Sequence, residues 1–414
     1  MAASGSWLDR RLLSAVQKLA GDVPIRPAGD KMPPKSANLE PLRPSIVIKN
    51  PRVLPDLVLN PEMGFGDAYS NGDLDVEGDL VRLLESLYGK PRRLSTRLLA
   101  KWLDWSQANT LRGSRRNIHH HYDIPTDFYQ LWLDRELVYT CAYFPRPDST
   151  LEEAQEAKMD LVCRKVWLRP GDTVVEAGCG WGALALHMAR NYGVRVKAFN
   201  ISHEQIAFAR ERAKKEGLAS RVEFIEDDSR NISGKFDAFV SVGMLEHLGH
   251  KNYAEFGRVI RRTVGDTGRG LLHFIGRTQP QPFSVWIRRR VFPGAHAPSL
   301  HEAMDVLEPQ DYSVLDVENL RPHYAKTLEH WLERFERSYA VVEGRFGSAF
   351  ARMWRLYLAG SIAGFRAGNL QLFQIVFTGS KCAVQPWTRS YLYENGTGQA
   401  AQEKQEKQWI RATS

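Results

Sequence analysis

The stretch TVVEAGCGWG, residues 173–182, has the residue types and spacing of a loop that holds a ligand. A β-branched run leads to Gly178, Gly180 and Gly182 at every second position, and an apolar segment follows. Glycine has no Cβ, so its backbone can adopt positive φ and approach a bound molecule. The pattern is neither the dinucleotide G-x-G-x-x-G nor a phosphate loop, since no Gly-Lys-Ser/Thr follows. It predicts a ligand at the carboxyl end of the first strand of a doubly wound sheet, with an ordinary tight turn as the alternative.

Glu176 and the alternating glycines resemble the donor-binding loop of class I S-adenosylmethionine-dependent methyltransferases. In that fold the second strand usually ends in an acid that binds the ribose hydroxyls. Asn200 stands there in this chain and Gln205 follows, and both amides can still bond hydroxyl groups. The third strand is expected to end near Asp227 and Asp228, where a carboxylate can accept from the adenine amino group. A turn or cap role is the alternative for both acids.

Other reactive side chains are isolated in the sequence. Glu246 and His247 follow an apolar strand at the edge where ligands bind, and an acid there could be a base, a stabiliser or an anchor. His273 lies in the apolar run LLHFIG, where a buried core histidine is the simpler interpretation. The adjacent residues 119–121 are histidines, but neighbouring side chains do not converge on a metal, so no metal site is predicted. Cys141 is expected to have a hydrogen-bonding role, because methyl transfer needs no thiol nucleophile.

Composition limits the classes of protein and partner. With 414 residues, 43% apolar and 25% charged, the chain can form an α/β domain and a smaller one. A net charge of +8 is compatible with an anionic membrane surface, and no motif supports a nucleic-acid partner. The 4 cysteines are scattered, so neither a zinc site nor a disulfide framework is predicted, and a reducing, cytoplasmic compartment is expected.

No apolar run approaches the roughly 20 residues that span a bilayer. Charged residues 9–11 occupy the place of a signal peptide's apolar region, so secretion is not expected. Six apolar residues instead fall on about one face of an N-terminal helix: Trp7, Leu8, Leu12, Leu13, Val16 and Leu19. This face could pack on its own domain or touch lipid.

Apolar patterns predict the elements that position these residues. The expected order is strand 173–177, helix 183–192, strand 194–199, helix 203–216, strand 222–226, strand 236–242, helix 252–264 and strand 270–275. A helix over 152–166, capped by Ser149, precedes them. An inserted helix and loop over 280–310, helices over 325–343 and 347–367, and a strand over 370–379 follow. Such alternation is typical of a parallel sheet, so the fold class is α/β, doubly wound and Rossmann-like.

The chain is expected to have four parts. Residues 1–95 form a small mixed domain, in which SIVIKN and LPDLVL are short strands, NPEMGFGDAYSNGDLD is a loop and residues 80–88 are a helix. Residues 96–119 form a basic helical connector, and 120–393 form the catalytic domain. The polar tail 394–414 is expected to be disordered.

Ten segments, taken in order, resemble cyclopropane-fatty-acyl-phospholipid synthases and their mycolic-acid relatives. They are HYDIPTDFY, YTCAYF, EEAQEAK, GCGWG, NISHEQ, VGMLEHLGHKNY, LLHFIG, VFPGAHAPS, HYAKTL and GFRAGNLQLFQIVF. The resemblance covers about residues 120–380. MGFGDAYSNGDLD also resembles the small N-terminal, lipid-binding type of domain in the phospholipid enzymes, which favours that branch of the family.

The resemblance implies methyl transfer from S-adenosylmethionine to the cis double bond of an unsaturated acyl chain in membrane phospholipid. Loss of a proton from the new methyl group then closes a cyclopropane ring, with a bound bicarbonate as the base. The residues that the family assigns to the bicarbonate are Cys141, Glu246, His273, the backbone at Ile275, and Tyr324. The resemblance therefore favours a site role for His273 over the interpretation as a buried core residue.

The donor contacts implied by the resemblance are Tyr139, Thr140, Gly178, Gly180, Gln205 and Asp228. Four positions depart from the family's usual residues. Thr140 replaces a serine and Asn200 replaces a threonine or similar residue. Ser229 stands where an aromatic ring often stacks near adenine, and Leu245 stands where phenylalanine is usual in the acyl pocket.

Two other functions stay open. A related enzyme could leave a methyl or methylene branch in place of the ring, and a non-catalytic protein could use the same fold to bind lipid. The expected location is the inner face of the cell membrane, held peripherally, and a homodimer is a further expectation. Arg288, Arg289 and Arg290 are candidate contacts with anionic lipid, and ion pairs within their own domain are the alternative.

Overall fold

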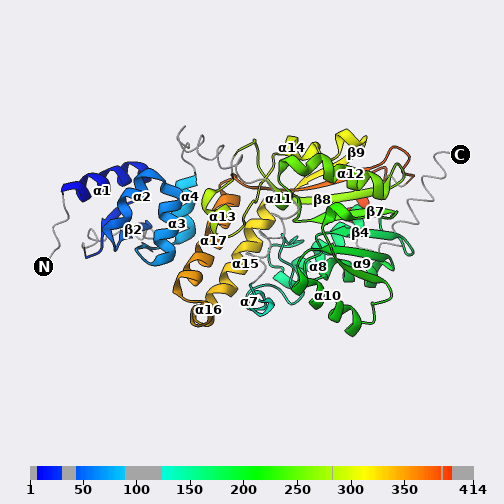
Figure 1. The fold of residues 1–414 in the computed structure, drawn as a ribbon, viewed down its shortest axis with the longest axis horizontal. Helices are drawn as coiled ribbons and strands as arrows, with labels where there is room; N and C mark the ends of the chain where they lie inside the picture. Colours follow the sequence, from blue (N-terminus) through cyan, green and yellow to red (C-terminus); the bar gives the residue numbers. More distant parts are fainter. Residues whose placement is uncertain (1–6, 30–42, 89–123, 282, 384–385, 394–414) are drawn as a thin grey trace. The chain divides into compact units, whose positions relative to one another are not determined.

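A computed structural model describes residues 7–29, 43–88, 124–281, 283–383 and 386–393 (Figure 1). The chain divides into two compact units. The first comprises residues up to 108 together with 282–293 and 324–370, and the second comprises the rest. The predicted connector 96–119 and tail 394–414 lie outside the described residues. Within the described ranges, no helix is both long and apolar enough to cross a membrane.

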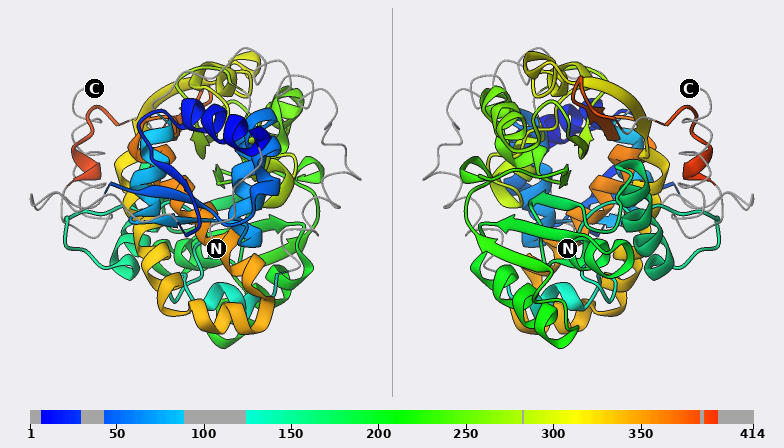
Figure 2. Two further views of the ribbon diagram at one scale, coloured as in Figure 1. Left: turned by 90° about the vertical axis from the view of Figure 1, so that its left-hand side faces the viewer. Right: turned by 90° about the vertical axis from the view of Figure 1, so that its right-hand side faces the viewer.

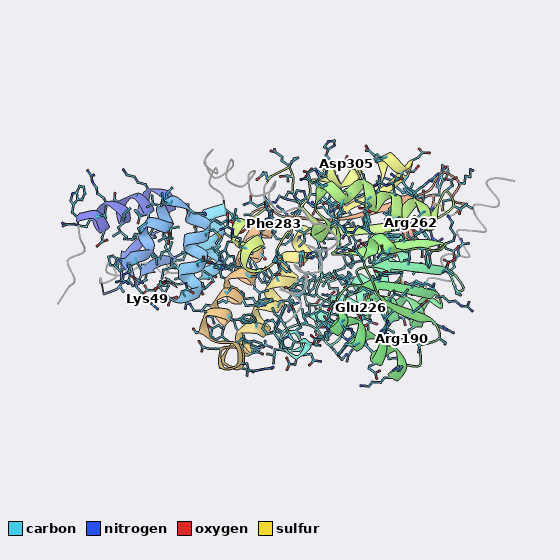
Figure 3. The ribbon with its side chains drawn as sticks, in the orientation of Figure 1. Lys49, Arg190, Glu226, Arg262, Phe283 and Asp305 are labelled. Atoms are coloured by element: carbon cyan, nitrogen blue, oxygen red, sulfur yellow. The ribbon has the colours of Figure 1, made fainter. Side chains whose placement is uncertain are left out.

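The first unit combines a small sheet with helices from three segments of the chain. Its elements are α1 (Trp7–Ala20), β1 (Ile25–Pro27), β2 (Ser45–Ile48), η1 (Pro51–Val53), α2 (Leu54–Leu59), α3 (Pro61–Asn71), β3 (Leu74–Glu77), α4 (Leu80–Tyr88), α13 (Val285–Arg290), most of α15 (Arg321–Arg337), α16 (Tyr339–Phe346) and α17 (Ser348–Arg366). β2 pairs in parallel with β1 and antiparallel with β3. Lys49, labelled in Figure 3, lies just after β2. It donates to Asp75 of β3 at 2.9 Å.

Helix α17 packs against α3 and α4, which joins residues 348–366 to the N-terminal segment. Arg352 donates to the carbonyls of Tyr69 at 2.6 Å and Leu74 at 3.0 Å, and its guanidinium lies 4.3 Å from the Tyr69 ring centre. The unit therefore differs from the predicted domain 1–95, because it also takes segments from the predicted catalytic range 120–393.

Two predictions for the N-terminal region are wrong. LPDLVL is helix α2 and not a strand, with Pro55 in its first turn, where a missing N–H costs nothing. The predicted loop starting at Asn60 is largely helix α3, capped by the Asn60 side chain. Gly64 serves close packing there, because an added Cβ would lie 2.7 Å from the backbone of Asp56.

The second unit is built on a seven-stranded sheet in the order β6-β5-β4-β7-β8-β10-β9. Its elements are α7 (Thr126–Gln130), α8 (Leu151–Lys165), β4 (Thr173–Ala177), α9 (Ala183–Tyr192), β5 (Arg195–Asn200), α10 (His203–Lys215), β6 (Val222–Glu226), η2 (Ser229–Asn231), β7 (Ala238–Val242), α11 (Leu245–Leu248), η3 (His250–Asn252), α12 (Tyr253–Val264), β8 (Arg269–Gly276), α14 (Leu300–Met304), η4 (Glu308–Gln310), β9 (Ser313–Asn319), β10 (Gln371–Thr378) and η5 (Ser390–Leu392). The first five strands of the order run parallel, and β10 is antiparallel to both neighbours.

Two apolar cores cover the two faces of this sheet. Figure 2 shows the ribbon from two further sides, with green helices beside the green strands of the sheet. Val174 of β4 belongs to the core shared with α8, α9 and α10, while Val175 belongs to the core shared with α12 and α14. Successive side chains of a strand point to opposite faces, so cover on both sides buries β4 from Val174 to Ala177. The predicted α/β doubly wound class is confirmed.

One local prediction in this unit is wrong, and one strand of the sheet was not predicted. The cap of α8 is Thr150 and not Ser149, since the Thr150 hydroxyl accepts from the backbone of Glu153 and the Glu153 carboxylate accepts from that of Thr150. Strand β9 was not predicted, because it lies at the sheet edge and carries exposed residues such as Leu315, which is 40% exposed. Edge strands lack the continuous apolar pattern of the interior strands.

Candidate active site at the carboxyl edge of the large sheet

The glycine loop begins at the end of β4, where the sequence places it. Gly178, Gly180 and Gly182 all have positive φ, at +88°, +53° and +85°. A Cβ on Gly180 would meet no atom within 4 Å, which leaves open space beside the backbone. A Cβ on Gly182 would instead lie 2.6 Å from the ring of Phe224. Gly180 therefore suits ligand approach, whereas Gly182 serves the packing between the loop and β6.

Asn200 ties the glycine loop to the start of α10. Its amide donates to the carbonyl of Gly180 at 3.3 Å and to Oε1 of Gln205 at 2.6 Å. Its own Oδ1 accepts from the backbone of Ile201 at 2.8 Å. Gln205 and Gly180, two predicted donor contacts, are thus neighbours. The Gln205 amide nitrogen has no hydrogen bond assigned to it among the described residues, so it can donate to a ligand hydroxyl.

Aromatic rings line the segment between α7 and the loop. The ring of Tyr129 lies 5.4 Å from that of Tyr139 and 4.9 Å from that of Trp181. Trp132 packs edge-on against Tyr139 at 5.3 Å. The indole N–H of Trp181 donates to Thr126 at 3.1 Å, which joins the loop to α7. Tyr139, a predicted donor contact, is therefore one member of a larger aromatic wall.

Asp228 has the cap role that the sequence left open. Its Oδ1 accepts from the backbone of Arg230 at 2.9 Å, and its Oδ2 accepts from the guanidinium of that residue at 2.8 Å. Asp227 accepts from the backbone of Asp228 at 2.7 Å and from Asn231 at 2.8 Å. The contact of Asp228 with adenine stays a prediction, and it would have to share the carboxylate with Arg230.

Thr140 is held by two residues of α8 that the sequence reasoning did not assign. Gln155 donates to the carbonyls of Val138 at 3.2 Å and Thr140 at 2.9 Å, and Lys158 donates to the Thr140 hydroxyl at 3.0 Å. Burial lowers the pKa of Lys158 to about 8, opposed by nearby acids. Burial also raises the pKa of Glu176 to about 8, and Lys158 opposes this rise.

The sequence did contain a signal for these buried lysines. Lys158 and Lys165 are seven residues apart in α8, so they lie on one face of the helix. That face is otherwise formed by small and apolar residues, namely Leu151, Ala154 and Leu161. A lysine at an apolar position of a helix indicates a buried cation with a specific acceptor.

Glu246 contacts β8, the strand that carries His273. Glu246 lies on α11, directly after β7, and its Oε1 accepts from the backbone N–H of Ile275 at 2.5 Å. The side chain of His273 is 2% exposed, and its Nδ1 lies 3.0 Å from Nε2 of Gln374. Within the described residues, Oε2 of Glu246 and Nε2 of His273 are buried with no hydrogen-bond partner. The Ile275 amide is thus bonded to Glu246.

Cys141 and Tyr324 complete the predicted set. Cys141 is fully buried, and its thiol donates to the carbonyl of Ala142 at 3.1 Å. The charge of Lys158 interacts with Cys141 and also lowers the pKa of His273. These residues therefore share one electrostatic environment. Tyr324 belongs to the first unit, where its ring packs 4.6 Å from that of Phe365.

The pKa of Glu246 makes stability depend on pH in a testable way. Burial raises its pKa from 4.5 to about 7, so the unfolded chain releases this proton at lower pH than the folded chain. Stability falls as pH rises between these two values, because the folded state binds more protons. We expect Glu246→Gln to be more stable than the wild type, by a margin that grows roughly 2–3 kcal/mol between pH 5 and pH 8.5.

Urea unfolding at both pH values measures this margin. Glu223→Gln, at an exposed position of β6, is measured beside it as the control for the exchange of Glu by Gln itself. A margin for Glu246→Gln that is equal at pH 5 and pH 8.5 would contradict the raised pKa.

The candidate lipid-contacting arginines on α13 divide into different roles. Arg288 is 6% exposed, so it lies inside its unit. Arg290 donates to both carboxylate oxygens of Asp67, at 3.0 and 2.8 Å. The indole of Trp286 donates to the same acid at 3.2 Å. Only Arg289 of the three is both exposed and without an ion pair in the described part of the chain.

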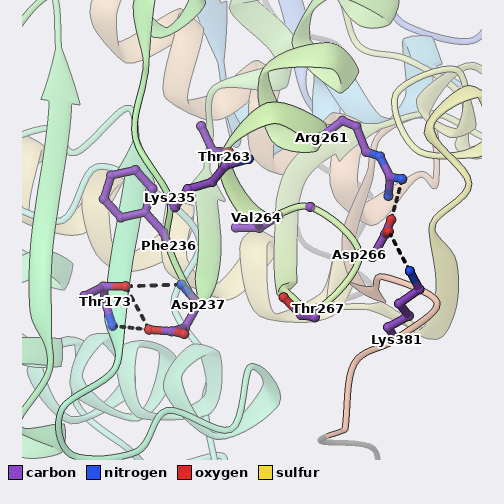
Figure 4. Close-up of a pocket in the computed structure, with 11 residues that line it drawn as sticks. Thr173, Lys235, Phe236, Asp237, Arg261, Thr263, Val264, Asp266, Thr267 and Lys381 are labelled. Atoms are coloured by element: carbon purple, nitrogen blue, oxygen red, sulfur yellow. Dashed lines mark hydrogen bonds and ion pairs between the residues drawn. The ribbon is translucent and has the colours of Figure 1, made fainter.

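A cavity of about 670 Å³ lies at the opposite, amino-terminal edge of the large sheet (Figure 4). Two cations of its lining pair with one acid: Asp266 bonds Arg261 and lies 3.6 Å from Lys381. Asp237 accepts from the backbone and the hydroxyl of Thr173 at 2.7 and 2.8 Å. Ligands of doubly wound sheets bind at the carboxyl edge, so this cavity is not the candidate active site.

Comparison with known proteins gives a consistent family. The sequence model of "Mycolic acid cyclopropane synthetase" matches residues 109–375, more than half of the chain. A probable fatty acid methyltransferase of Pseudomonas putida is 36% identical over 367 residues, which cover 84% of this chain and 91% of the relative. The cyclopropane-fatty-acyl-phospholipid synthase of Escherichia coli K12 is 33% identical over 347 residues, which cover 80% of this chain and 87% of the relative.

A solved structure agrees with these relatives. The mycolic acid cyclopropane synthase CmaA1, crystallised with SAH and CTAB, matches with a TM-score of 0.60 and 30% identity. The match covers 64% of this chain and 97% of that protein. The open space at Gly180 and the donor amide of Gln205 fit the predicted methyl donor. The chain belongs to the mycolic acid cyclopropane synthetase family and is an S-adenosylmethionine-dependent methyltransferase.

Proposed function

We propose that the protein methylates the cis double bond of an unsaturated acyl chain in membrane phospholipid and closes a cyclopropane ring, with bound bicarbonate as the base. The proposal of a bound anion rests on one observation: Oε2 of Glu246 and Nε2 of His273 are buried polar atoms without a partner in the described residues. Such atoms are costly unless a ligand bonds them. His273 lies on β8, and Glu246 bonds the backbone of Ile275, two residues further along the same strand.

The residues suit a small oxyanion. Near neutral pH Glu246 keeps a share of its proton, because burial raises its pKa to about 7, and its Oε2 can then donate. Burial and the charges of Lys158 and Lys165 lower the pKa of His273 well below 6.5, so its ring is neutral. A bicarbonate held there would supply the base that accepts a proton from the new methyl group. Tyr324 and Cys141 are the further holders that the family resemblance implies.

The acyl substrate needs alignment and an apolar setting. An alkene is a weak nucleophile, so catalysis depends on holding the donor's methyl group close to the double bond. Gly180, Gln205 and Tyr139 are the proposed donor contacts. The ring of Tyr139, packed against Tyr129 and Trp132, is partly exposed and offers an aromatic face that stabilises a passing cation.

A phospholipid substrate is supported by how much of this chain each relative matches. The match to the phospholipid enzyme of Escherichia coli covers 80% of this chain, against 64% for the mycolic acid synthase structure. Trp7 and Leu8 of α1 are 62% and 56% exposed, and with Arg289 they are the proposed contacts with an anionic membrane surface. The proposed location is therefore peripheral, on the inner face of the cell membrane.

A second candidate is an acyl methyltransferase that leaves a methyl or methylene branch. The relative from Pseudomonas putida, a probable fatty acid methyltransferase, favours it. A hydride shift in the cation, followed by loss of a proton from the methyl group, would give the methylene branch from the same site, whereas a saturated methyl branch also needs a hydride-donating reductant. A ring and a methylene branch have equal mass, so the two products must be separated chemically.

The function is tested with purified protein, S-adenosylmethionine and vesicles of unsaturated phosphatidylglycerol or phosphatidylcholine. We expect gas chromatography with authentic standards to show the cyclopropane ester, and proton NMR to show no new vinylidene signal. Removing bicarbonate from the buffer should lower the rate, and the anionic vesicles should bind more protein. Vinylidene protons would establish the branched product, and a rate independent of bicarbonate would exclude the proposed base.

A further inference from the structure

Four polar side chains form a hydrogen-bonded chain that ends on the ring of His273. Glu318 of β9 and Lys165 of α8 form an ion pair, with 2.5 Å between Oε2 and Nζ. Lys165 also donates to Oε1 of Gln374 on β10 at 2.7 Å. Nε2 of Gln374 lies 3.0 Å from Nδ1 of His273 on β8. Lys165 and Gln374 have no exposed surface, so water does not compete for these bonds.

The sheet itself sets this alignment. Gln374 is the direct cross-strand partner of His273 on one side and of Glu318 on the other. Directly opposed residues of neighbouring strands have their side chains on the same face of the sheet. Lys165 reaches that face from the last turn of α8. The chain of contacts therefore rests on three paired strands and one helix, and not on loops.

The direction of each hydrogen bond follows from the chemistry of the groups. A lysine ammonium can only donate, so the oxygen of the Gln374 amide must face Lys165. The amide nitrogen then faces His273, and it also can only donate. Nδ1 of His273 must accept, which means that it carries no proton. A neutral imidazole has one N–H, so the proton is on Nε2.

We propose that Lys165 and Gln374 are positioning residues that fix His273 as its Nε2–H tautomer, so that the ring presents a donor to the anion of the active site. That the acceptor of this hydrogen bond is the bound anion rests on the proposed function. Nε2 is the ring nitrogen that is buried without a partner in the described residues. An Nε2 lone pair would repel an oxyanion, whereas an Nε2–H bonds it.

Gln374→Glu tests the inference with almost no change of shape. A carboxylate can only accept, so it forces a proton onto Nδ1 of His273 while it still accepts from Lys165. Lys165→Met is the second variant, since it removes the ammonium that orients the Gln374 amide and keeps an unbranched side chain. Folding of both variants is checked by the affinity for S-adenosylhomocysteine, whose proposed contacts lie at the glycine loop.

Nitrogen NMR of the histidine-labelled protein, without donor or bicarbonate, reads the tautomer directly. The His273 signals are assigned by their loss in His273→Asn. We expect a protonated Nε2 and an unprotonated Nδ1 in the wild type, a protonated Nδ1 in Gln374→Glu, and mixed tautomers in Lys165→Met. Turnover should fall about 10²–10³-fold in Gln374→Glu, the usual cost of losing one donor to an oxyanion, without a change in donor KM.

Two results would overturn the inference. One is a wild-type ring with its proton on Nδ1. The other is a ring whose signals stay unchanged in both variants while these bind S-adenosylhomocysteine normally. An Nε2–H ring in a protein that forms no cyclopropane product would uphold the tautomer and reject the proposed function, so the two failures are distinguishable.

Discussion

Replacement of Gly180 by valine is expected to abolish binding of S-adenosylhomocysteine, with an affinity loss greater than about a hundredfold. The backbone of Gly180 has a φ of +53°, which a β-branched residue adopts only with strain. Its Cβ would enter the open space beside the loop and not the protein core. The strain destabilises the free and the bound protein alike, so the loss of affinity comes from overlap of the valine side chain with the ligand. At about 3 kcal/mol, the upper end of the usual cost of overpacking, this overlap corresponds to more than a hundredfold. Isothermal titration calorimetry measures it.

Gly217→Val is the matched control for backbone strain. Gly217 follows α10 with a φ of +69°, and a Cβ there also meets no atom within 4 Å. Both variants should lose thermal stability to a similar extent, but only the substitution at Gly180 should lose the ligand. Equal affinity of the two variants for S-adenosylhomocysteine would show that the Gly180 backbone does not face the donor.

Substitution of His273 should separate donor binding from turnover. Asparagine can keep the bond to Gln374, because its Oδ1 takes the place of Nδ1, but it offers no group at the position of Nε2. Turnover on unsaturated phospholipid vesicles should therefore fall about 10²–10³-fold in His273→Asn, as when one donor to an oxyanion is removed. The affinity for S-adenosylhomocysteine should stay that of the wild type.

His273→Gln provides the matched comparison, because its amide nitrogen reaches the Nε2 position and can donate there. It should recover part of the turnover that asparagine loses. Equal turnover of the two variants would show that the hydrogen bond from the Nε2 position does not contribute, and loss of donor affinity in both would show a structural role only.

The interior strands of the large sheet were predictable because they are buried on both faces. Strands such as β4 and β8 are nearly continuous apolar runs, and the glycines after β4 mark the loop. Helix α3 was missed because Gly64 and Gly66 indicate a loop when only local sequence is read. An added Cβ on Gly66 would lie 2.3 Å from the indole of Trp286. Glycine is therefore needed at this position because of a contact with a segment more than 200 residues later, which local sequence does not reveal.

Two residues of the candidate site could be identified from the sequence, whereas the contacts behind His273 could not. Family motifs identified Glu246 and His273, and the structure brings both to β8. Lys165 and Gln374 lie within predicted elements, but their contact depends on the pairing of β10 between β8 and β9. Antiparallel insertion of the last strand cannot be read from a pattern of apolar residues, because that pattern does not specify which strand is the neighbour.

Because the first unit is built from three separate segments of the chain, it cannot complete its fold until late in synthesis. Helices α3 and α4 emerge early, but α17, which covers them, begins only at Ser348. Synthesis of residues 89–347 takes roughly 15–50 s at about 5–20 residues per second. During that time the apolar side chains of Leu83 and Leu84 lack their native cover. The nascent N-terminal segment thus has to keep apolar surface from aggregating during that time, and it completes its fold after most strands of the large sheet have been made.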